Sequence, residues 1–302
     1  MTLRVATIGD GAMATVCSQV VAGKCTPHKP IEVRVWVRDS YQLAEMNAAH
    51  ENLRYLPGVK VAENVVFMGD DAAVFEGVKF IISAVPAQFL RGALERLKKH
   101  VPPDVPVVSV TKGIEIATLR RPSEIIGEIL GPHRGIAALS GPCIAGELAQ
   151  KLPATMVVAV SGQWTMVHGA EGEETELARW IQELFTTPYL RVYRNADILG
   201  VELAGALKNV IAIAAGILDG MRMGNNAKAA LLTRGLVEIT RLGTTLGAQA
   251  ETFAGLAGMG DLVTTCVSPE GRNRSFGERV GRGEKPAAVL ASMLGIVEGV
   301  PT

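Results

Sequence analysis

The feature that most constrains this chain is an alternation of two patterns over residues 3–194. Short runs of β-branched and other apolar residues, typical of strands, alternate with segments of helical periodicity. Several of these runs are continuously apolar, as strands covered on both faces of a sheet are. The alternation therefore predicts an α/β domain with a doubly wound parallel sheet. Strands are expected at 3–8, 31–37, 79–85, 105–110, 135–139, 155–160 and 190–193, and helices at 13–22, 42–50, 88–100, 123–130 and 173–185.

Beyond Asp197 long Ala, Leu, Ile and Gly runs with helical spacing continue to the end of the sequence. We therefore expect two domains, an α/β domain at 1–194 and an all-α domain at 195–302. The most apolar run, 201–218, approaches the length of a membrane span, but it carries Glu202 and Lys208, which favours a helix buried in protein. The polar stretch 161–174 is expected to be a surface insertion.

Composition narrows the class of protein and its partners. The 302 residues are 48% hydrophobic, enough for a substantial core, and 30 basic side chains balance 30 acidic ones. Neither nucleic acid nor an anionic membrane is therefore an expected partner. The 5 histidines are scattered without ligand spacing, so no metal site is expected. Cysteines without a CxxC pair, and a strand pattern where a signal peptide would stand, indicate a reduced, cytoplasmic protein.

A glycine turn follows the first predicted strand and opens a helix. Gly9, Gly11 and Ala14 have the G-x-G-x-x-A spacing, and Ala12 and Met13 lie between them. In that context backbone N–H groups can approach a pyrophosphate, whose charge the helix N-terminus favours. Glycine turns also occur as ordinary tight turns, but this one stands at the head of a βα series. It predicts a Rossmann-type domain that binds a dinucleotide.

The second predicted strand ends at Arg38 and Asp39, where such domains contact the ribose of the adenine half. An acidic side chain there accepts a hydrogen bond from the 2′-hydroxyl of NAD, and a cation favours the 2′-phosphate of NADP. Arg38 comes first and gives a lean towards NADP, with NAD kept open. The alternative is that both residues are solvated loop charges.

One lysine lies within the long apolar run. Ala204 and Gly205 are within a turn of Lys208, so the helix surface around its amine is low. Burial there would lower the pKa of the lysine and allow it to exchange protons near neutrality. A lysine that extends to solvent is the alternative. Asn209, the next residue, is a candidate for binding substrate oxygens or for a hydrogen bond between helices.

A second cluster, at 258–274, gathers a carboxylate, hydroxyl groups and two arginines after a glycine-rich start. The guanidinium fork matches phosphate oxygens, and hydroxyls add neutral donors, so the cluster predicts a phosphate pocket. A solvated basic loop is the alternative. Asp261 is also expected to hold the Lys208 ammonium and stabilise its charged form. The candidate substrate residues here are Asp261, Thr265, Gly271, Arg272 and Asn273.

Two turns of the first domain follow predicted strands at the carboxyl edge of the sheet, where α/β folds bind ligands. Lys112 follows the strand at 105–110 and is a candidate for orienting a carbonyl or a phosphate. Gly141, Cys143 and Ala145 follow the strand at 135–139 and open a helix near the expected nicotinamide half. The cysteine is expected to pack rather than to act as a nucleophile.

These motifs resemble those of the NAD(P)-dependent glycerol-3-phosphate dehydrogenases. The resemblance implies reversible hydride transfer between NAD(P)H and dihydroxyacetone phosphate, giving sn-glycerol 3-phosphate. It covers nearly the whole chain in the family's order, which makes it specific. The matching segments are 9–14, 36–38, 52–57, 85–86, 111–113, 139–147, 200–216, 224–230, 255–261, 264–266, 272–273 and 297–299.

The resemblance also implies roles for single residues. Lys208 matches the catalytic proton donor and acceptor, Lys112 matches a lysine that touches substrate and cofactor, and Asp261 completes the expected catalytic set. A homodimer is expected from the apolar surface of the helical domain. Substrate positions correspond to Gly141, Cys143, Asp261, Gly271, Arg272 and Asn273, and cofactor positions to Ala145, Arg272 and Glu298.

Several features depart from the family's pattern. Cys143 stands where relatives commonly carry serine, Met13 replaces the usual aromatic residue of the turn, and Ala12 replaces a small polar one. The loop at 23–30 is longer than in compact bacterial members. The sequence ends at Thr302 where relatives continue through a further helix, so a C-terminal truncation is expected.

Two other interpretations stay open. A hydroxyacid or ketopantoate-type reductase shares the architecture and a catalytic lysine, but the phosphate cluster argues against it. A non-catalytic dinucleotide sensor would not need Lys208, Lys112 and Asp261 together. Turnover of dihydroxyacetone phosphate, without turnover of unphosphorylated keto acids, would separate these interpretations.

Overall fold

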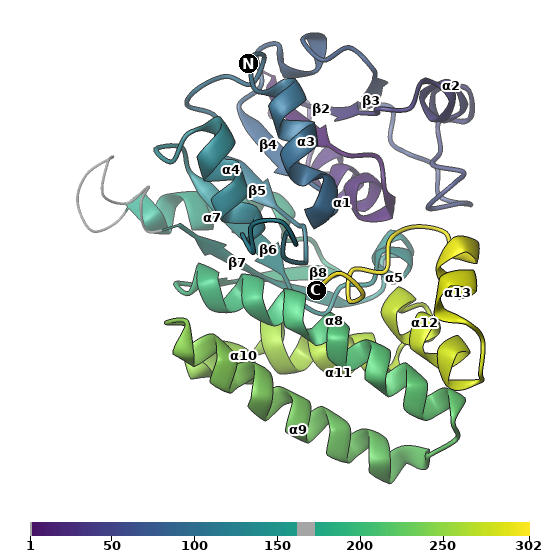
Figure 1. The fold of residues 1–302 in the computed structure, drawn as a ribbon. Coiled ribbons are helices and arrows are strands. Elements are labelled where there is room, and N and C mark those ends of the chain that lie inside the picture. Colours follow the sequence, from purple (N-terminus) through teal and green to yellow (C-terminus); the bar gives the residue numbers. More distant parts are fainter. Residues whose placement is uncertain (1, 162–172) are drawn as a thin grey trace.

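The computed structural model describes residues 2–161 and 173–302. In this part of the chain, strands form one sheet with the order β3-β2-β1-β4-β5-β6-β7-β8, and a group of helices lies below it in Figure 1. The strands are β1 (Leu3–Ile8), β2 (Ile31–Trp36), β3 (Val65–Met68), β4 (Phe80–Ser83), β5 (Val107–Ser109), β6 (Ile136–Ser140), β7 (Ala154–Val160) and β8 (Leu190–Asn195). The helices around the sheet are α1 (Ala12–Ala22), α2 (Ser40–Ala49), η1 (Ala73–Phe75), α3 (Ala87–Leu97), α4 (Pro122–Leu130), α5 (Ala145–Ala149) and α7 (Glu173–Phe185).

The strands and helices predicted for the first part of the sequence are present in the described residues, with small shifts at their ends. One strand, β3, was missed. It is short and lies at the edge of the sheet, where Val65 and Phe67 are buried but Val66 is exposed. So short a pattern does not stand out from a loop. The predicted insertion at 161–174 lies almost entirely outside the described residues.

The predicted doubly wound sheet is confirmed, and its strands are parallel apart from one pairing, in which β7 runs antiparallel to β6. A parallel connection needs a crossover element that returns the chain along the length of the sheet. Between β6 and β7 the chain forms only the short α5, and β7 therefore starts from the edge at which β6 ended. The other pairings are parallel, including that of β8 with β7 after α7.

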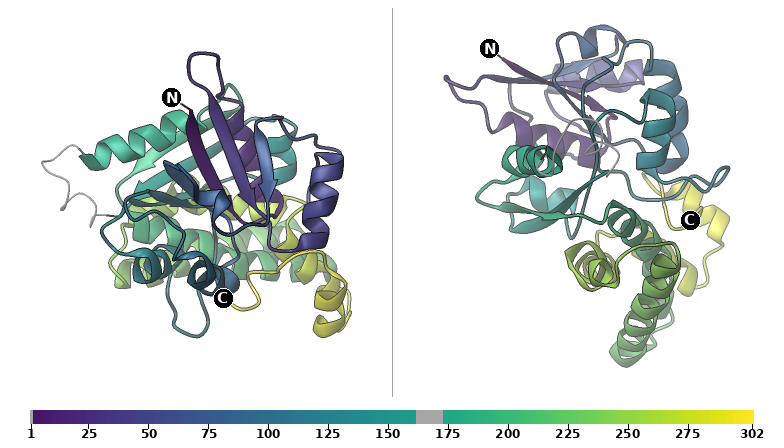
Figure 2. Two further views of the ribbon diagram at one scale, coloured as in Figure 1. Left: turned by 90° about the horizontal axis from the view of Figure 1, so that it is seen from above. Right: turned by 90° about the vertical axis from the view of Figure 1, so that its left-hand side faces the viewer.

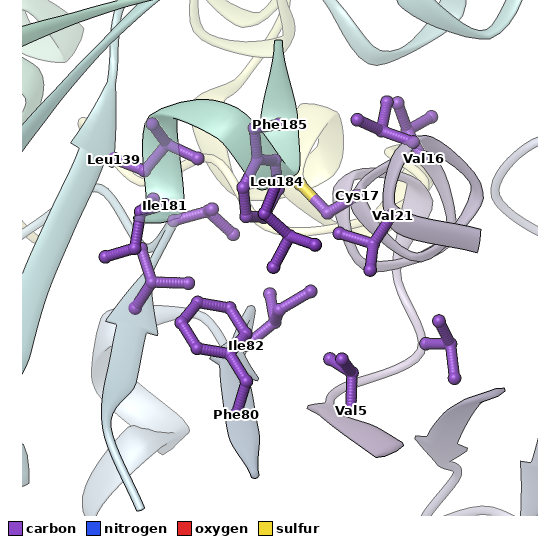
Figure 3. Close-up of a cluster of buried hydrophobic side chains, with 14 of the residues drawn as sticks. Val5, Val16, Cys17, Val21, Phe80, Ile82, Leu139, Ile181, Leu184 and Phe185 are labelled. Atoms are coloured by element: carbon purple, nitrogen blue, oxygen red, sulfur yellow. The ribbon is translucent and has the colours of Figure 1, made fainter. Parts of the chain in front are cut away.

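Helices cover the sheet on both faces. One core cluster joins the sheet to α1 and α7, and the other joins it to α3 and α4. Figure 3 shows the first cluster, in which Cys17 of α1, Phe80 of β4 and Phe185 of α7 lie together. These side chains are at most 1% exposed, so the doubly wound arrangement follows from strands that are apolar on both faces.

The second part of the chain is helical, as predicted. Its longest helix, α8, packs on β6 and β7 and against the neighbouring helices α9, α11 and α12 (Figures 1 and 2). α8 is long and apolar enough to cross a membrane by length and composition, but most of its apolar stretch is buried within this protein. The elements are α8 (Ile198–Gly220), α9 (Gly224–Thr245), α10 (Ala250–Ala254), η2 (Leu256–Gly260), α11 (Asp261–Val267), α12 (Arg272–Gly281) and α13 (Pro286–Ser292).

Glycines at the contact between α8 and α12 allow the backbones of the two helices to touch. A Cβ added at Gly277 of α12 would overlap the carbonyl oxygen of Ile213 on α8, and one at Gly216 of α8 would overlap the carbonyl oxygen of Arg274. Gly220 and Gly281 continue the same contact one turn further on. This close approach sets where α12 begins relative to α8, and hence where its first residues lie.

Candidate functional site

The site lies where the carboxyl ends of β5 and β6 meet α8. Lys112 follows β5 and donates a hydrogen bond from Nζ to the carbonyl oxygen of Gly141, which follows β6, at 3.1 Å. Asp261, the first residue of α11, reaches the same point from the helical part. The chain thus brings together residues that lie far apart in the sequence, at the edge where parallel strands bind ligands.

Asp261 bridges two lysines. Its Oδ1 lies 2.6 Å from Lys208 Nζ, and its Oδ2 lies 2.5 Å from Lys112 Nζ. Lys208 also donates a hydrogen bond to the hydroxyl of Thr265, one turn further along α11. The expected contact between Lys208 and Asp261 is therefore confirmed, and a second ammonium shares the carboxylate.

Burial changes the acidity of Lys208. Its side chain is only 5% exposed, so it does not extend to solvent. Removal from water lowers the pKa of Lys208 to about 8, Asp261 partly opposes this effect, and the positive charge of Lys112 lowers the pKa further. An amine with such a pKa can both give and take a proton near neutrality.

A glycine allows α8 to come close to the sheet. A Cβ added at Gly205 would lie 3.0 Å from the hydroxyl of Ser140 and 3.6 Å from Cγ of Lys112. Any larger residue would therefore push the end of β6 and the Lys112 side chain away from the helix. The small residues predicted to surround Lys208 on α8 leave room beside the helix, and the Lys112 side chain lies in that room.

Asn209 and Asn273 bind each other. Asn273 Nδ2 donates to Asn209 Oδ1 at 3.0 Å, and the Gly299 N–H donates to Asn273 Oδ1 at 2.8 Å. Asn209 Nδ2 donates to the carbonyl oxygen of Gly205 at 3.3 Å. Both amides thus link α8, α12 and the segment around 299, and a role in binding substrate stays a prediction.

The segment around 299 places a carboxylate beside the sheet. Glu298 is 8% exposed, and its Oε2 lacks a hydrogen-bond partner among the described residues. Burial raises the pKa of Glu298 to about 7, which Arg272 and the Ala87 backbone partly oppose. A Cβ at Gly113 would lie 3.0 Å from this oxygen. The cofactor position that the resemblance implies for Glu298 stays a prediction.

The glycine turn fits a dinucleotide. Gly9 has a φ of 116°, and a Cβ there would lie 2.9 Å from the carbonyl oxygen of Ala84, so only glycine suits the position. Around a Cβ at Gly11, the described chain leaves open space. The N-terminus of α1 has no side-chain cap within that part of the chain, which leaves the N–H groups of Ala12, Met13 and Ala14 for a pyrophosphate.

Arg38 and Asp39 differ in what they contact. The Asp39 carboxylate caps α2, because its Oδ1 accepts the N–H of Tyr41 at 2.8 Å and that of Gln42 at 3.2 Å. Arg38 is exposed after β2. Burial raises the pKa of Asp10 in the glycine turn, and the charges of Arg38 and Arg54 oppose this effect. The Asp39 carboxylate is thus bonded to the start of α2, whereas Arg38 is exposed at the end of β2.

Sequence reasoning gave no role to Asn52, which holds the glycine turn in place. Its Nδ2 donates to the carbonyl oxygen of Asp10 and to the hydroxyl of Thr15, both at 2.8 Å, and its Oδ1 accepts the N–H of Tyr55 at 3.1 Å. Asn52 is 0% exposed. The motif at 52–57 was visible, but a loop asparagine carries no sign of its burial.

Cys143 and Ala145 lie at the other side of the site. Burial raises the pKa of the Cys143 thiol to about 11, so the thiol stays protonated and is unsuited to act as a nucleophile. Ala145 is the first residue of α5. Within the described residues, His, Cys, Asp and Glu side chains form no group that could hold a metal ion.

Two family models match the chain. The N-terminal model of NAD-dependent glycerol-3-phosphate dehydrogenase matches residues 4–165, and the C-terminal model matches residues 197–302. Together they include both lysines and Asp261.

Curated relatives and solved structures agree. A glycerol-3-phosphate dehydrogenase [NAD(P)+] of Geobacter sp. is 44% identical over 100% of this chain and 86% of its own, and one of Thermobifida fusca is 44% identical over 98% and 84%. The crystal structure of glycerol-3-phosphate dehydrogenase from Coxiella burnetii has a TM-score of 0.90 at 34% identity, covering 99% of this chain and 86% of that one. The enzyme from Saccharomyces cerevisiae has a TM-score of 0.83 at 31% identity, covering 99% and 88%. The glycine turn, the two lysines that share Asp261 and these matches together place the chain in the NAD-dependent glycerol-3-phosphate dehydrogenase family, as an NAD(P)-dependent oxidoreductase.

Proposed function

We propose that this chain catalyses reversible hydride transfer between NAD(P)H and dihydroxyacetone phosphate, giving sn-glycerol 3-phosphate, with Lys208 as proton donor and acceptor. The observation that carries the proposal is the contact of two lysines, the buried Lys208 and the half-buried Lys112, with one buried carboxylate, Asp261, at the carboxyl edge of the sheet. The names of the curated relatives support the same substrate pair.

The lysines supply what ketone reduction needs from the protein. The bound reduced nicotinamide supplies the hydride. As the carbonyl carbon is reduced, negative charge grows on its oxygen and must be met by a proton or a cation. Lys208 gives that proton from Nζ, and the ammonium of Lys112 stabilises the same charge. In the reverse direction the neutral amine of Lys208 takes the proton from the hydroxyl.

The phosphate of the substrate would bind at the start of α12. Arg272 offers a guanidinium fork, Thr265 offers a hydroxyl, and the backbone at Gly271 precedes the helix N-terminus. Asn209 and Asn273 hold each other, and each amide keeps a second N–H for a ligand oxygen. Binding energy from the phosphate would fix the carbonyl between cofactor and Lys208.

The preference for NADP over NAD is a proposal that rests on Arg38. A dehydrogenase that reads the 2′-hydroxyl of NAD needs an acidic side chain free at the end of β2. Here the carboxylate of Asp39 is bonded to backbone N–H groups of α2, and Arg38 stays exposed beside it. A cation without a competing acid suits a 2′-phosphate.

A steady-state assay tests the substrate and the cofactor at once. We expect oxidation of NADPH with dihydroxyacetone phosphate, a slower or weaker reaction with NADH, and none with unphosphorylated keto acids. Reduction of ketopantoate or another keto acid in its place would favour the hydroxyacid-reductase interpretation. Cofactor binding without turnover of any triose phosphate would favour the sensor.

Three further proposals carry over from the sequence. The division into domains at 195 coincides with the change from β8 to α8. A cytoplasmic location is supported by thiols that are free in the described chain. A homodimer is supported by apolar side chains exposed on α8 and α9, such as Val210 and Leu242, and its test is the mass of the protein in solution.

A further inference from the structure

Glu202 of α8 reaches into the N-terminus of α4. Its Oε1 accepts the N–H of Ser123 at 2.8 Å, and its Oε2 accepts the hydroxyl of Ser123 at 2.5 Å and Nη1 of Arg121 at 2.6 Å. The Glu202 side chain is 2% exposed. A carboxylate from the helical part therefore caps a helix of the sheet part.

These contacts are strong and directional. Each joins an ionised or dipolar donor to a carboxylate, and the N-terminus of α4 favours negative charge. Burial raises the pKa of Glu202, and Arg121 and Ser123 oppose this effect. A buried carboxylate without hydrogen-bond donors strongly destabilises the folded protein, as an unpaired buried charge does. α8 is therefore held in the position in which the Glu202 carboxylate reaches all of its donors.

Two of the contacts between α8 and the sheet part lie near the two ends of one segment. Lys112 stands at the start of the connection from β5 to α4, beside Gly205 of α8. Ser123 stands at its end, beside Glu202. Fixing Glu202 therefore fixes this connection against the same helix that carries Lys208.

The remaining packing of α8 on the sheet is between apolar side chains, several of them small. Val201 of α8 packs against Ala138 of β6 and Ala159 of β7. Apolar contact is non-directional and leaves sliding and rotation of a helix weakly specified. Glu202 and Lys208 are about 9 Å apart along the helix axis, at a rise of about 1.5 Å per residue. A shift at one is passed directly to the other.

We propose that Glu202 is a positioning residue for the reaction, which sets the place of Lys208 and Lys112 relative to the cofactor by locking α8 to the N-terminus of α4. The inference rests on the proposed function. Glu202 is assigned no contact with substrate or cofactor. Its effect on the reaction comes through the positions of the two lysines.

The test compares Glu202→Gln with a matched control, Asp197→Asn. Asp197 is also a buried carboxylate of α8, and it accepts bonds from Gly200, Gln249 and Thr252, each at 2.8 Å. These three partners of the Asp197 carboxylate belong to the helical part, and the substitution leaves the bond from the Asp197 backbone N–H to Asn195 of β8 in place. Asp197→Asn therefore weakens folding without loosening α8 from the sheet.

Glu202→Gln is expected to lower kcat by about 10- to 100-fold, since a misplacement of about 1 Å has effects of this size. The dissociation constant of the cofactor, followed by its fluorescence, is expected to stay the same. The deuterium isotope effect on kcat, measured with cofactor labelled at the transferred hydrogen, is expected to rise because the chemical step becomes slower. Asp197→Asn is expected to keep kcat and the isotope effect when assayed below its melting temperature.

Ser123→Ala provides a second, milder variant if Glu202→Gln does not fold. It is expected to lower kcat in the same direction, and the double variant is expected to lose less than the product of the two single losses. The proposal would be overturned if both variants lost kcat and if the size of each loss followed only the drop in melting temperature of Glu202→Gln or Asp197→Asn. Full kcat in Ser123→Ala would also overturn it. Failure of the proposed function is distinguishable, because the wild-type protein would then show no turnover of dihydroxyacetone phosphate.

Discussion

Lys208 and Asp261 lie 53 positions apart in the sequence, and in the structure Nζ of the lysine is 2.6 Å from Oδ1 of the aspartate. The other oxygen of Asp261 contacts Lys112 at 2.5 Å, so a single carboxylate faces two ammonium groups. Burial lowers the pKa of Lys208 to about 8, the carboxylate of Asp261 opposes this effect, and the positive charge of Lys112 adds to it. The predictions on acid–base chemistry follow from that relationship.

Replacing Lys208 by alanine is expected to reduce kcat by about 10²- to 10⁴-fold, the usual contribution of a general acid or base. The dissociation constant of NADPH is expected to stay close to that of the wild type, because the proposed role is in proton transfer. Steady-state rates and fluorescence titration measure the two quantities. Lys98→Ala, at an exposed lysine of the sheet part, is the control. An unchanged turnover in Lys208→Ala would remove the lysine from the mechanism.

Asp261→Asn is expected to move the pH profile to lower pH. Asp261 raises the pKa of Lys208 and so holds it at about 8; without that charge, burial and Lys112 lower it further. Ketone reduction needs the ammonium, so its rate should begin to fall at a lower pH than in the wild type. Alcohol oxidation needs the amine and should gain activity at a lower pH.

The logarithm of kcat/KM against pH, recorded in both directions, checks this shift. Glu284→Gln serves as control, because it removes a carboxylate that pairs with Arg279 at the surface. A profile that moves to higher pH in Asp261→Asn would contradict the assignment of the titrating group to Lys208.

Arg38→Ala is expected to raise the KM for NADPH and leave the KM for NADH nearly unchanged. The physical reason is the loss of a cation beside the 2′-phosphate, a charge that NADH lacks. Initial rates with each cofactor at saturating dihydroxyacetone phosphate provide the measurement. Equal effects on both cofactors would show that Arg38 does not distinguish them.

Gly277→Ala is expected to lower stability by about 1–3 kcal/mol or more, because the added methyl group overlaps the backbone of α8. The same change at Gly92 of α3, where the described chain leaves open space, is expected to raise stability by about 0.5–1 kcal/mol through helix propensity. Denaturant unfolding of both variants tests the contrast. Equal stability of the two would contradict the close crossing of α8 and α12.

Local patterns were enough to predict most elements of the fold. Runs of consecutive apolar residues predicted β4 and β5, because a strand covered on both faces of a sheet is apolar at nearly every position. The direction of β7 was beyond such patterns, because it depends on the length of the connection through α5. The edge strand β3 was missed because half of its side chains meet solvent.

The sequence by itself determined which residues of the site are chemically able to act: a lysine among small residues, a carboxylate after glycines, and a cation at the end of β2. Only the tertiary structure decided their partners. In the structure Asp39 caps α2 and Asn209 binds Asn273. Lys112 contacts Asp261 as a second lysine, and Glu202 binds the N-terminus of α4. Residue type and spacing fix chemistry and local conformation, but charges and hydrogen bonds act over a few ångströms in space. Only the packing of α8 on the sheet brings these groups within that range.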